Sequence, residues 1–384
     1  MLYLYSTTNN NMKIMSNAIS IERTFFDAIG TADMERVHSA VIGWILSDDC
    51  KAYNMAERST ILTKLFKERA SKAFKSMRTC LEYNHMDIYT VTDEGTKSEC
   101  VWVVENKVKS AQGKDQLGRY FEDFSDTKSH GLLLSLIDEV PAHNMWKSNT
   151  YSSLHDILDE LSMSGTNEGH KVIVKEYIKT ISNLTATVDN FISSPASYRN
   201  VFEDGYKKKA QKEERIATFN DSQRYISNNN LETVLQKLYL TKIKTMIEGS
   251  FTGYKFSIGE THGTALINFE LSNGMNLNKR RYELQFQGGT FKFAVVLNDY
   301  AKISSTELKA MNETWGPIFL TLKGGNYGYK RLCPGKSHSR VAISKQLQFT
   351  DNKEWWDRPL KDVAEALERE FATLPQLIAK VDII

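Results

Sequence analysis

The sequence predicts a mixed α/β fold made of two domains. Two observations lead to this expectation. Between residues 78 and 137, three runs of β-forming residues are followed by a short helical segment and a fourth, strongly apolar run. From residue 254 onward, apolar and polar residues alternate through four successive runs, which is typical of an antiparallel sheet with one buried face. A chain of 384 residues is long enough for two domains with cores of their own.

The composition is that of an ordinary globular protein, with 41% hydrophobic and 25% charged residues. The net charge is only +2, so any nucleic-acid surface has to come from local clustering of basic residues. The first fifteen residues lack the pattern of a signal peptide, and no run approaches the ~20 apolar residues of a membrane span. The four cysteines are scattered without a C-x-x-C pair, which disfavours zinc and disulfides. We therefore expect a cytoplasmic protein without a membrane partner.

The first element of the α/β part is a helix expected from Met34 to Leu46, with Thr31 or Asp33 as its N-cap. Glu35 and His38 share one face of this helix, and apolar residues form the buried stripe. We expect Glu35 to face outward, where its carboxylate carries little packing. His38 is expected to act as a hydrogen-bonding neighbour of a site rather than as a metal ligand.

An antiparallel meander of three strands is expected next, over Arg78 to Glu82, His85 to Val91 and Glu99 to Val108. The last two strands flank a polar loop and form a hairpin. If this loop turns about Gly95, Asp87 lies opposite Val103, and Glu105 is its diagonal neighbour on the same face of the sheet.

Glu105 and Lys107 are two residues apart on the third strand, so their side chains project from one face while Asn106 projects from the other. Together with Asp87, they place two carboxylates and an ammonium group at one strand end. Carboxylate oxygens hold Mg²⁺, which activates a water molecule, and a lysine can orient that water or offset developing charge. The pattern suits metal-dependent phosphodiester hydrolysis. Taken alone, it also fits a solvated strand end with an ion pair.

A short helix is expected from Gln116 to Phe124, followed by an apolar strand from Gly131. Gln116 and Tyr120 are four residues apart and therefore lie on one face of this helix. This makes Gln116 a candidate neighbour of the carboxylates. The alternative is an exposed glutamine beside a packed tyrosine.

This series of motifs resembles the PD-(D/E)XK nuclease superfamily. The similarity is to a branch with E-x-x-H-S in the first helix, E-N-K in the third strand and Q-L-x-R-Y in the second helix. These motifs read here as ERVHS from Glu35, ENK from Glu105 and QLGRY from Gln116, and the likeness covers roughly residues 20 to 190. One departure is Met86, which stands where the superfamily's name has a proline.

The resemblance implies a restriction-endonuclease-like core of the order α-βββ-α-β. It also implies a Mg²⁺ site in which Mn²⁺ can substitute. The resemblance implies that Asp87, Glu105 and Glu35 are metal ligands. These three are also catalytic residues, together with Lys107 and Gln116. His38 and Tyr120 are implied as hydrogen-bonding neighbours of the ligands.

Further helices are expected from Glu57 to Phe74, just before the first sheet, and beyond Trp146 over Leu154 to Leu161, Val172 to Val188 and Leu231 to Ile247. The first of these carries several lysines, which form either a solvated face or a phosphate contact. We therefore expect a nuclease-like domain with a helical extension over residues 1–215, a helical connector over 216–250, and a C-terminal α+β domain over 251–384.

The C-terminal domain is expected to contain four antiparallel strands, joined by turns at Asn273-Gly274 and Gly288-Gly289. The second turn predicts the pairs Phe286–Phe291, Leu284–Phe293, Tyr282–Val295 and Gln285–Lys292. The elements expected after this sheet are a helix from Ser305 to Trp315, an apolar run from Pro317 to Leu322, a strand from Arg340 to Phe349 and a closing helix from Pro359 to about Lys380. Basic and aromatic residues of this half, Arg281 among them, form either a nucleic-acid surface or a solvated sheet face.

We expect a Mg²⁺-dependent nuclease that hydrolyses phosphodiester bonds, with DNA favoured over RNA as the substrate. The C-terminal domain is expected to guide the choice of substrate or partner. The alternative is a catalytically inactive nucleic-acid-binding or scaffold protein with the same fold. Every position of the metal-binding set is occupied, which favours the enzyme. A homodimer or a partner subunit is compatible with both functions. Endonuclease or exonuclease action and the biological role stay open, because a fold does not settle a function.

Overall fold

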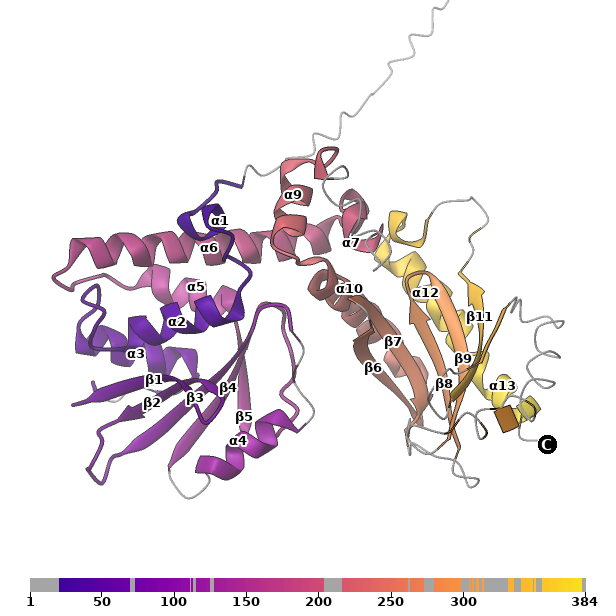
Figure 1. The fold of residues 1–384 in the computed structure, drawn as a ribbon, viewed down its shortest axis with the longest axis horizontal. Coiled ribbons are helices and arrows are strands. Elements are labelled where there is room, and N and C mark those ends of the chain that lie inside the picture. Colours follow the sequence, from indigo (N-terminus) through magenta and orange to yellow (C-terminus); the bar gives the residue numbers. More distant parts are fainter. Residues whose placement is uncertain are drawn as a thin grey trace, which may run out of the picture.

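A computed structural model of the chain contains two β-sheets, each covered by helices, and the two sheets lie side by side in Figure 1. This arrangement confirms a mixed α/β fold. The structure describes residues 21–69, 73–110, 112, 115–124, 128–203, 216–261, 263–272, 280–297, 304, 306, 309–310, 313, 331–334, 340–347, 349 and 354–381.

The first sheet has five strands in the order β1-β2-β3-β4-β5. Its strands are β1 (Met77–Tyr83), β2 (Met86–Thr92), β3 (Cys100–Lys107), β4 (Ser129–Ser135) and β5 (Trp146–Thr150). The pairs β1–β2 and β2–β3 are antiparallel, whereas β3–β4 and β4–β5 are parallel. The strand β3 lies in the centre and is buried along its whole length except at Lys107. The run of apolar residues in this strand is what a strand covered on both faces requires.

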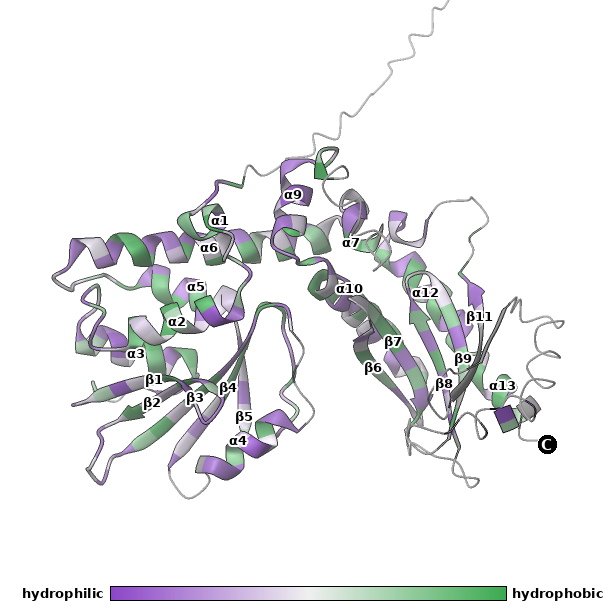
Figure 2. Ribbon diagram, viewed as in Figure 1, coloured by the Kyte–Doolittle hydropathy of each residue, from purple (hydrophilic) through white to green (hydrophobic). Residues whose placement is uncertain are grey.

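Helices cover both faces of this sheet (Figure 1). One face carries α2 (Glu35–Leu46), α3 (Met55–Leu65), α5 (Tyr151–Glu160) and α6 (Glu168–Ser193), and the other carries α4 (Gln116–Phe124). The short helix α1 (Phe25–Ala28) packs against α6. Hydrophobic and hydrophilic residues alternate along α6, as they do in a helix with one buried side (Figure 2).

Several helix ends differ from the sequence expectation. The N-cap of α2 is Met34, which makes no capping hydrogen bond through its side chain, so neither Thr31 nor Asp33 caps this helix. The helix expected to reach Phe74 ends at Leu65, because Lys67 adopts a left-handed conformation with φ 55°. The helix α4 has the expected bounds, and β5, which no expectation included, adds a second parallel strand beside β4.

The register between β2 and β3 corrects the expected pairing. Thr92 pairs with Cys100 and Ile88 with Val104, so Asp87 continues the ladder opposite Glu105 rather than opposite Val103. The loop between the strands is therefore centred one residue later than Gly95. A shift of the pairing by two residues keeps the same side chains on the same face, since side chains alternate with a period of two.

The second sheet has six antiparallel strands in the order β10-β11-β9-β8-β7-β6. Its strands are β6 (Tyr254–Thr261), β7 (Thr264–Leu271), β8 (Arg280–Gln287), β9 (Thr290–Leu297), β10 (Arg331–Pro334) and β11 (Arg340–Gln346). The β8–β9 hairpin confirms all four predicted pairs. Gly288 and Gly289 have φ values of 52° and 77°, which a two-residue turn between twisted strands requires. Neither an expected strand nor an expected turn corresponds to β10.

The apolar face of this sheet packs against helices. Those that cover it are α10 (Glu232–Ile247), α12 (Leu360–Phe371) and α13 (Leu374–Val381). The single closing helix expected from the sequence is thus two helices. The break follows from Pro375, which has no amide hydrogen to donate to the carbonyl of Phe371. Thr373 then donates its hydroxyl to the carbonyl of Glu370 at 2.7 Å.

The helix α10 joins the two halves of the molecule. Its Gln236 accepts a hydrogen bond from the backbone of Ala265 in β7 at 2.9 Å and donates one to the carbonyl of Val201. Lys237 of the same helix forms an ion pair with Glu260 of β6 at 2.5 Å. The connector expected over residues 216–250, which also contains α9 (Asp221–Asn228), therefore packs closely against the second sheet.

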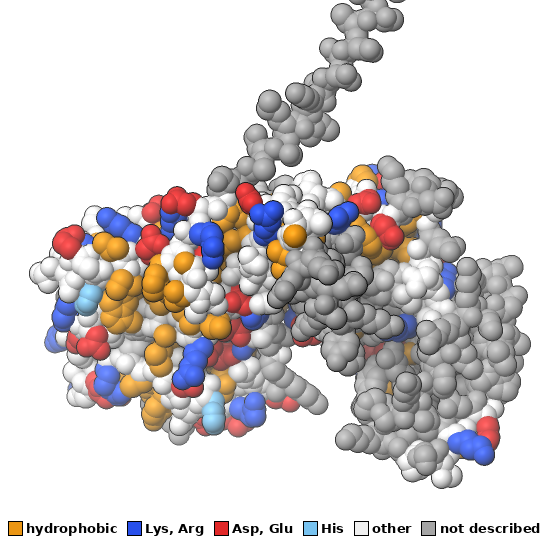
Figure 3. Space-filling view, turned by 45° about the horizontal axis from the view of Figure 1, so that its top comes forward, with side chains coloured by type: hydrophobic (Ala, Val, Ile, Leu, Met, Phe, Trp, Pro, Cys, Tyr) orange, Lys and Arg blue, Asp and Glu red, His pale blue; other side chains and the backbone are white. Residues whose placement is uncertain are grey.

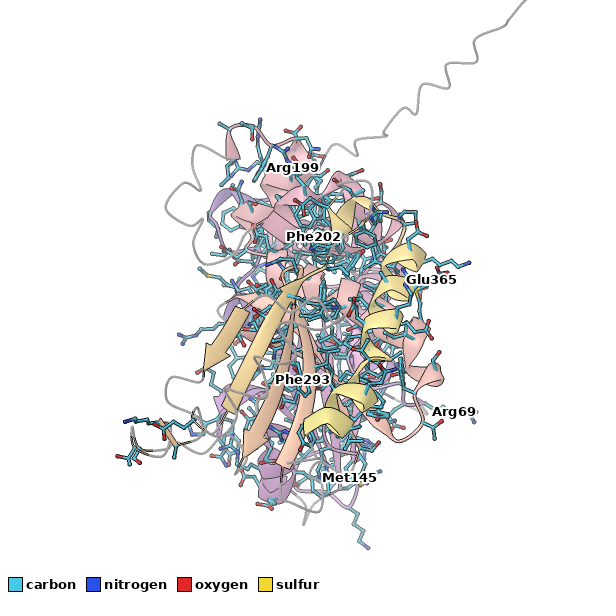
Figure 4. All side chains as sticks on the ribbon, turned by 90° about the vertical axis from the view of Figure 1, so that its right-hand side faces the viewer. Arg69, Met145, Arg199, Phe202, Phe293 and Glu365 are labelled. Carbon is cyan, nitrogen blue, oxygen red and sulfur yellow. The ribbon has the colours of Figure 1, made fainter. Side chains whose placement is uncertain are left out.

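Aromatic residues fill the junction between the halves. Phe202 of α7 (Arg199–Glu203), which is labelled in Figure 4, contacts Trp355 and Tyr239 with ring centroids 4.9 and 5.0 Å apart. Phe191, near the end of α6, contacts Tyr239 in turn. Aromatic rings bury large areas, so this cluster holds α6, α7 and α10 together.

Some expected features fall outside the described residues. They are the Asn273-Gly274 turn, most of the helix from Ser305 to Trp315, the run from Pro317 to Leu322 and most of the basic and aromatic residues near residue 330. Arg281 is described, and it forms ion pairs with Glu270 and Glu283. Opposite charges are interspersed on the face that Figure 3 shows. Within the described ranges, we find no helix long and apolar enough to cross a membrane.

Candidate active site

The candidate site lies at the C-terminal end of β3, on the face of the sheet that α4 covers. Glu105 and Lys107 project side by side from this strand, with Nζ of Lys107 2.6 Å from Oε1 of Glu105. The side chains are 2% and 11% exposed for Glu105 and Lys107, respectively. Two opposite charges are therefore held together at the edge of a core, where solvent screens them little.

The helix α4 brings Gln116 and Tyr120 to the same place. Gln116 begins the helix, and its Nε2 donates to Oε1 of Glu105 at 2.7 Å and to the hydroxyl of Tyr120 at 2.9 Å. The Tyr120 hydroxyl donates to the carbonyl of His85 at 2.8 Å. Both side chains thus lie where the four-residue spacing predicts, and Tyr120 links α4 to the turn before β2.

Asp87 approaches the same strand end from β2. Its Oδ2 accepts a hydrogen bond from the backbone N–H of Asn106 at 2.8 Å. Burial raises the pKa of Asp87, while the Asn106 hydrogen bond and the charge of Lys107 oppose this rise. Asp87, Glu105 and Lys107 therefore interact electrostatically across two neighbouring strands.

Glu105 is the most perturbed carboxyl of the site. Burial, and next the charge of Asp87, raise its pKa to about 7, although Lys107 and Gln116 oppose the change. Its Oε1 receives both hydrogen-bond donors, whereas Oε2 is buried and has no hydrogen-bond partner among the described residues. A buried carboxylate oxygen without a partner costs free energy, which a bound cation would offset.

Lys107 carries a positive charge in this setting. Burial lowers the pKa of its ammonium group, but the adjacent carboxylate of Glu105 outweighs burial, and the net pKa lies above the ordinary value. Lys107 is therefore protonated at neutral pH and can donate hydrogen bonds or stabilise negative charge, but it cannot accept a proton.

Glu35 lies elsewhere than expected for a metal ligand. Its Oε1 accepts hydrogen bonds from the backbone N–H groups of Val108, Lys109 and Ser110 at 2.8 to 2.9 Å, and its Oε2 accepts the Ser110 hydroxyl at 2.7 Å. Burial raises the pKa of Glu35, but these hydrogen bonds outweigh it and lower the net pKa. Both oxygens are engaged, so Glu35 holds the loop after β3 rather than facing solvent.

This geometry reverses the expected effect of Glu35 on stability. Replacing Glu35 by glutamine removes the charge that accepts four hydrogen bonds, so the free energy of unfolding should fall by about 2 kcal/mol. Urea unfolding followed by circular dichroism measures this change. The control is Glu82→Gln, which removes an ion pair whose two side chains are largely exposed and should cost less than about 0.5 kcal/mol. Equal stability of parent and Glu35→Gln would contradict the anchoring role.

His38 is a core residue. It is 1% exposed, its Nε2 donates to the carbonyl of Ala32 at 2.8 Å, and its Nδ1 lies 3.0 Å from the hydroxyl of Tyr177. The carbonyl can only accept, so Nε2 carries the hydrogen and Nδ1 accepts from Tyr177. Burial lowers the pKa of His38 to about 4, which keeps the ring neutral. His38 does not hydrogen-bond to Asp87, Glu105 or Lys107 in the described structure.

The described residues fit a metal with two protein carboxylates. Within these ranges, no group of three or more His, Cys, Asp or Glu residues is arranged to hold a metal ion, so the three expected ligands do not form one cluster. Asp87 and Glu105 do fit a cation, since the charge of Asp87 raises the pKa of Glu105, and Oε2 of Glu105 has no hydrogen-bond partner among the described residues. Carboxylate oxygens are the donors that Mg²⁺ prefers, and this ion keeps several waters as its other ligands.

Two contributors to the site could not be found from the sequence. Ser110 contacts Glu35 across 75 positions of the chain, and Tyr151 contacts Asn106 across 45 positions. Neither residue belongs to a motif or to a periodic stripe shared with its partner. Long-range contacts of this kind leave no local signal.

Comparison with known proteins returns no match: no family model, no curated protein and no solved structure matches this chain.

Proposed function

We propose that this chain is a Mg²⁺-dependent nuclease that hydrolyses phosphodiester bonds, with DNA favoured over RNA as the substrate. The observation that carries the proposal is the buried Glu105, whose Oε1 is held by Lys107 and Gln116 while its Oε2 has no hydrogen-bond partner among the described residues. The similarity of the motifs to PD-(D/E)XK nucleases supports the same reading.

Asp87 and Glu105 would hold the metal through their carboxylates, at the start of β2 and the end of β3. When bound there, Mg²⁺ would polarise the phosphate and lower the pKa of a coordinated water. Gln116 keeps Oε1 of Glu105 in place through its amide. The backbone N–H of Asn106 does the same for Oδ2 of Asp87.

Lys107 supplies positive charge to the substrate. Because its ammonium group is protonated, it is suited to hold a nonbridging phosphate oxygen and to stabilise the charge that develops there. It cannot take the proton of the attacking water. That proton would pass to solvent or to the substrate if both Asp87 and Glu105 hold the metal through their carboxylates.

One observation favours the alternative of a catalytically inactive nucleic-acid-binding or scaffold protein. In the part of the chain that the structure describes, Glu35 is occupied by hydrogen bonds and no set of three metal-ligating residues forms. A nuclease with this core therefore has to work with two carboxylates. Direct measurement of metal-dependent cleavage decides between the two functions.

The proposal includes a nucleic-acid partner and a cytoplasmic location. Cys50, Cys80 and Cys100 have free thiols, which supports a reducing compartment. A homodimer or a partner subunit remains part of the proposal without a surface assigned to it.

The test is incubation of the purified chain with circular and linear, single- and double-stranded DNA and RNA, each with Mg²⁺ or with EDTA. We expect cleavage of at least one DNA substrate with Mg²⁺ and none with EDTA. Binding is measured in parallel on the same substrates. Binding without cleavage of any substrate would favour the inactive alternative.

A further inference from the structure

The side chain of Asn106 is a fully satisfied buried amide on the face of β3 opposite the site. It is 0% exposed, its Nδ2 donates to the carbonyl of Glu35 at 3.0 Å and to Oγ of Ser39 at 3.1 Å, and its Oδ1 accepts from the hydroxyl of Tyr151 at 2.6 Å. The backbone N–H of the same residue donates to Asp87. One residue thus joins α2, α5 and β3 to a proposed metal ligand.

The orientation of this amide is determined by its partners. The carbonyl oxygen of Glu35 can only accept, so the NH₂ group of Asn106 has to face α2. Oδ1 then faces Tyr151, which is the donor that the remaining end of the amide needs. Without that hydroxyl, Oδ1 would be a buried acceptor with no partner. The amide would then lower its free energy by rotating or shifting toward another donor.

Tyr151 itself is rigidly held. It is the first residue of α5, after the N-cap Thr150, and it is 0% exposed. The ring of His38 packs against it edge-on with centroids 5.1 Å apart, and His38 is fixed by Ala32 and Tyr177. A hydroxyl on a fully buried and packed ring has a defined position beside Asn106.

We propose that Tyr151 is a positioning residue for the metal site, an inference that rests on the function proposed above. Its hydroxyl fixes the Asn106 amide and therefore the end of β3 whose N–H group holds Asp87. In this proposal Tyr151 touches neither metal nor substrate, and it acts through its hydrogen bond to Asn106. It belongs to no motif that links the chain to nucleases.

The test variant is Tyr151→Phe, which removes the hydroxyl and keeps the ring. The matched control is Tyr53→Phe, because Tyr53 is 2% exposed and donates its hydroxyl to the carbonyl of Leu158, with no link to Asn106. Ser39→Ala is the milder second variant, since it removes one of the two acceptors of the Asn106 NH₂ group. All three variants are compared with the parent as full-length chains.

The first readout needs no metal. Exchange of the backbone amide hydrogen of Asn106 in the metal-free protein should be about tenfold faster in Tyr151→Phe than in the parent. The reason is that the hydrogen bond from this N–H group to Asp87 opens more often. Exchange should be unchanged in Tyr53→Phe and increase less in Ser39→Ala. Equal exchange of Asn106 in parent and Tyr151→Phe would overturn the inference, whatever the metal does.

The second readout is Mn²⁺ binding by titration calorimetry. Removing a hydrogen-bonding support of a metal ligand typically costs 10- to 100-fold in affinity, so Tyr151→Phe should bind Mn²⁺ about tenfold more weakly than Tyr53→Phe. Its cleavage rate should recover at saturating metal, which a general loss of stability would not allow. Equal affinity in the two variants would overturn the inference. If Asn106 exchanges faster in Tyr151→Phe than in the parent, but the parent binds no Mn²⁺, Tyr151 supports the Asn106–Asp87 hydrogen bond and the proposed Mg²⁺-dependent nuclease is refuted instead.

Discussion

Replacing Lys107 by alanine should lower the rate of Mg²⁺-dependent cleavage by a factor on the order of 10² to 10³. The physical reason is that the protonated ammonium group of Lys107 lies in a nearly buried position, where one fixed positive charge stabilises a developing phosphate charge far more than it does in water. Binding of the intact substrate should change much less, since several contacts share that role. Single-turnover cleavage and binding titrations on one substrate separate the two effects.

The control for this variant is Lys345→Ala. Lys345 is similarly buried, with a side chain that is 15% exposed, and it forms an ion pair with Glu370 in the C-terminal half. Its removal should leave the cleavage rate within about twofold of the parent at a temperature where both are folded. Undiminished cleavage by Lys107→Ala would refute the assigned role. In an inactive nucleic-acid-binding protein, the same substitution would only weaken binding and reduce its salt dependence by about one counterion.

The second large effect is expected for Glu105→Gln. The variant keeps an acceptor for Lys107 and Gln116 but loses the negative charge beside Asp87, so Mn²⁺ affinity should fall at least about 100-fold. Calorimetric titration measures this loss. The control is Glu283→Gln, because Glu283 is 2% exposed and forms an ion pair with Arg281 in the other sheet. Glu283→Gln should bind Mn²⁺ as the parent does.

Glu105 should also make the metal-free protein sensitive to pH. Its pKa is about 7 in the folded state and lies near its ordinary value of 4.5 in the unfolded state, so the folded state binds more protons between these values. The stability of the parent relative to Glu105→Gln should therefore fall as the pH rises from about 5 to about 8, by up to ~3 kcal/mol. Saturating Mg²⁺ should restore the stability of the parent at the higher pH and leave the stability of Glu105→Gln unchanged. A pH-independent difference would show that Glu105 does not carry the proton.

The sequence predicted the elements with strong local patterns. The bounds of α4 and the hairpin pairs across Gly288-Gly289 are correct because a helical stripe and a two-residue glycine turn are both encoded by neighbouring residues. The strands around the site were also found, with ends shifted by one or two residues. The predicted faces of their side chains are correct although the predicted register is wrong, since the register error is an even number of residues.

Elements without a local pattern were missed. The strand β5 has the polar sequence WKSNT, and it is a strand because it pairs with β4 and lies at the edge of the sheet. The lysine-rich segment after Leu65 has helical composition, but Lys67 turns the chain out of the helix. In these cases, pairing and chain reversal override propensity.

The sequence by itself determined which residues stand at the end of β3. Glu105 and Lys107 share a face because of a two-residue spacing, and Gln116 and Tyr120 share one because of a four-residue spacing. These spacings follow from the geometry of a strand and of a helix, and they hold in any fold that contains those elements.

Only the tertiary structure decided what each charged group does there. Glu35 and Glu105 are both acidic residues of the motifs found in the sequence. Glu35 accepts four hydrogen bonds and has a lowered pKa, whereas Glu105 has a raised pKa and one oxygen without a hydrogen-bond partner among the described residues. The difference arises from burial and from partners such as Ser110 that lie far away in the chain. A carboxylate's charge state depends on the three-dimensional balance of desolvation, hydrogen bonds and nearby charges, which residue spacing does not specify.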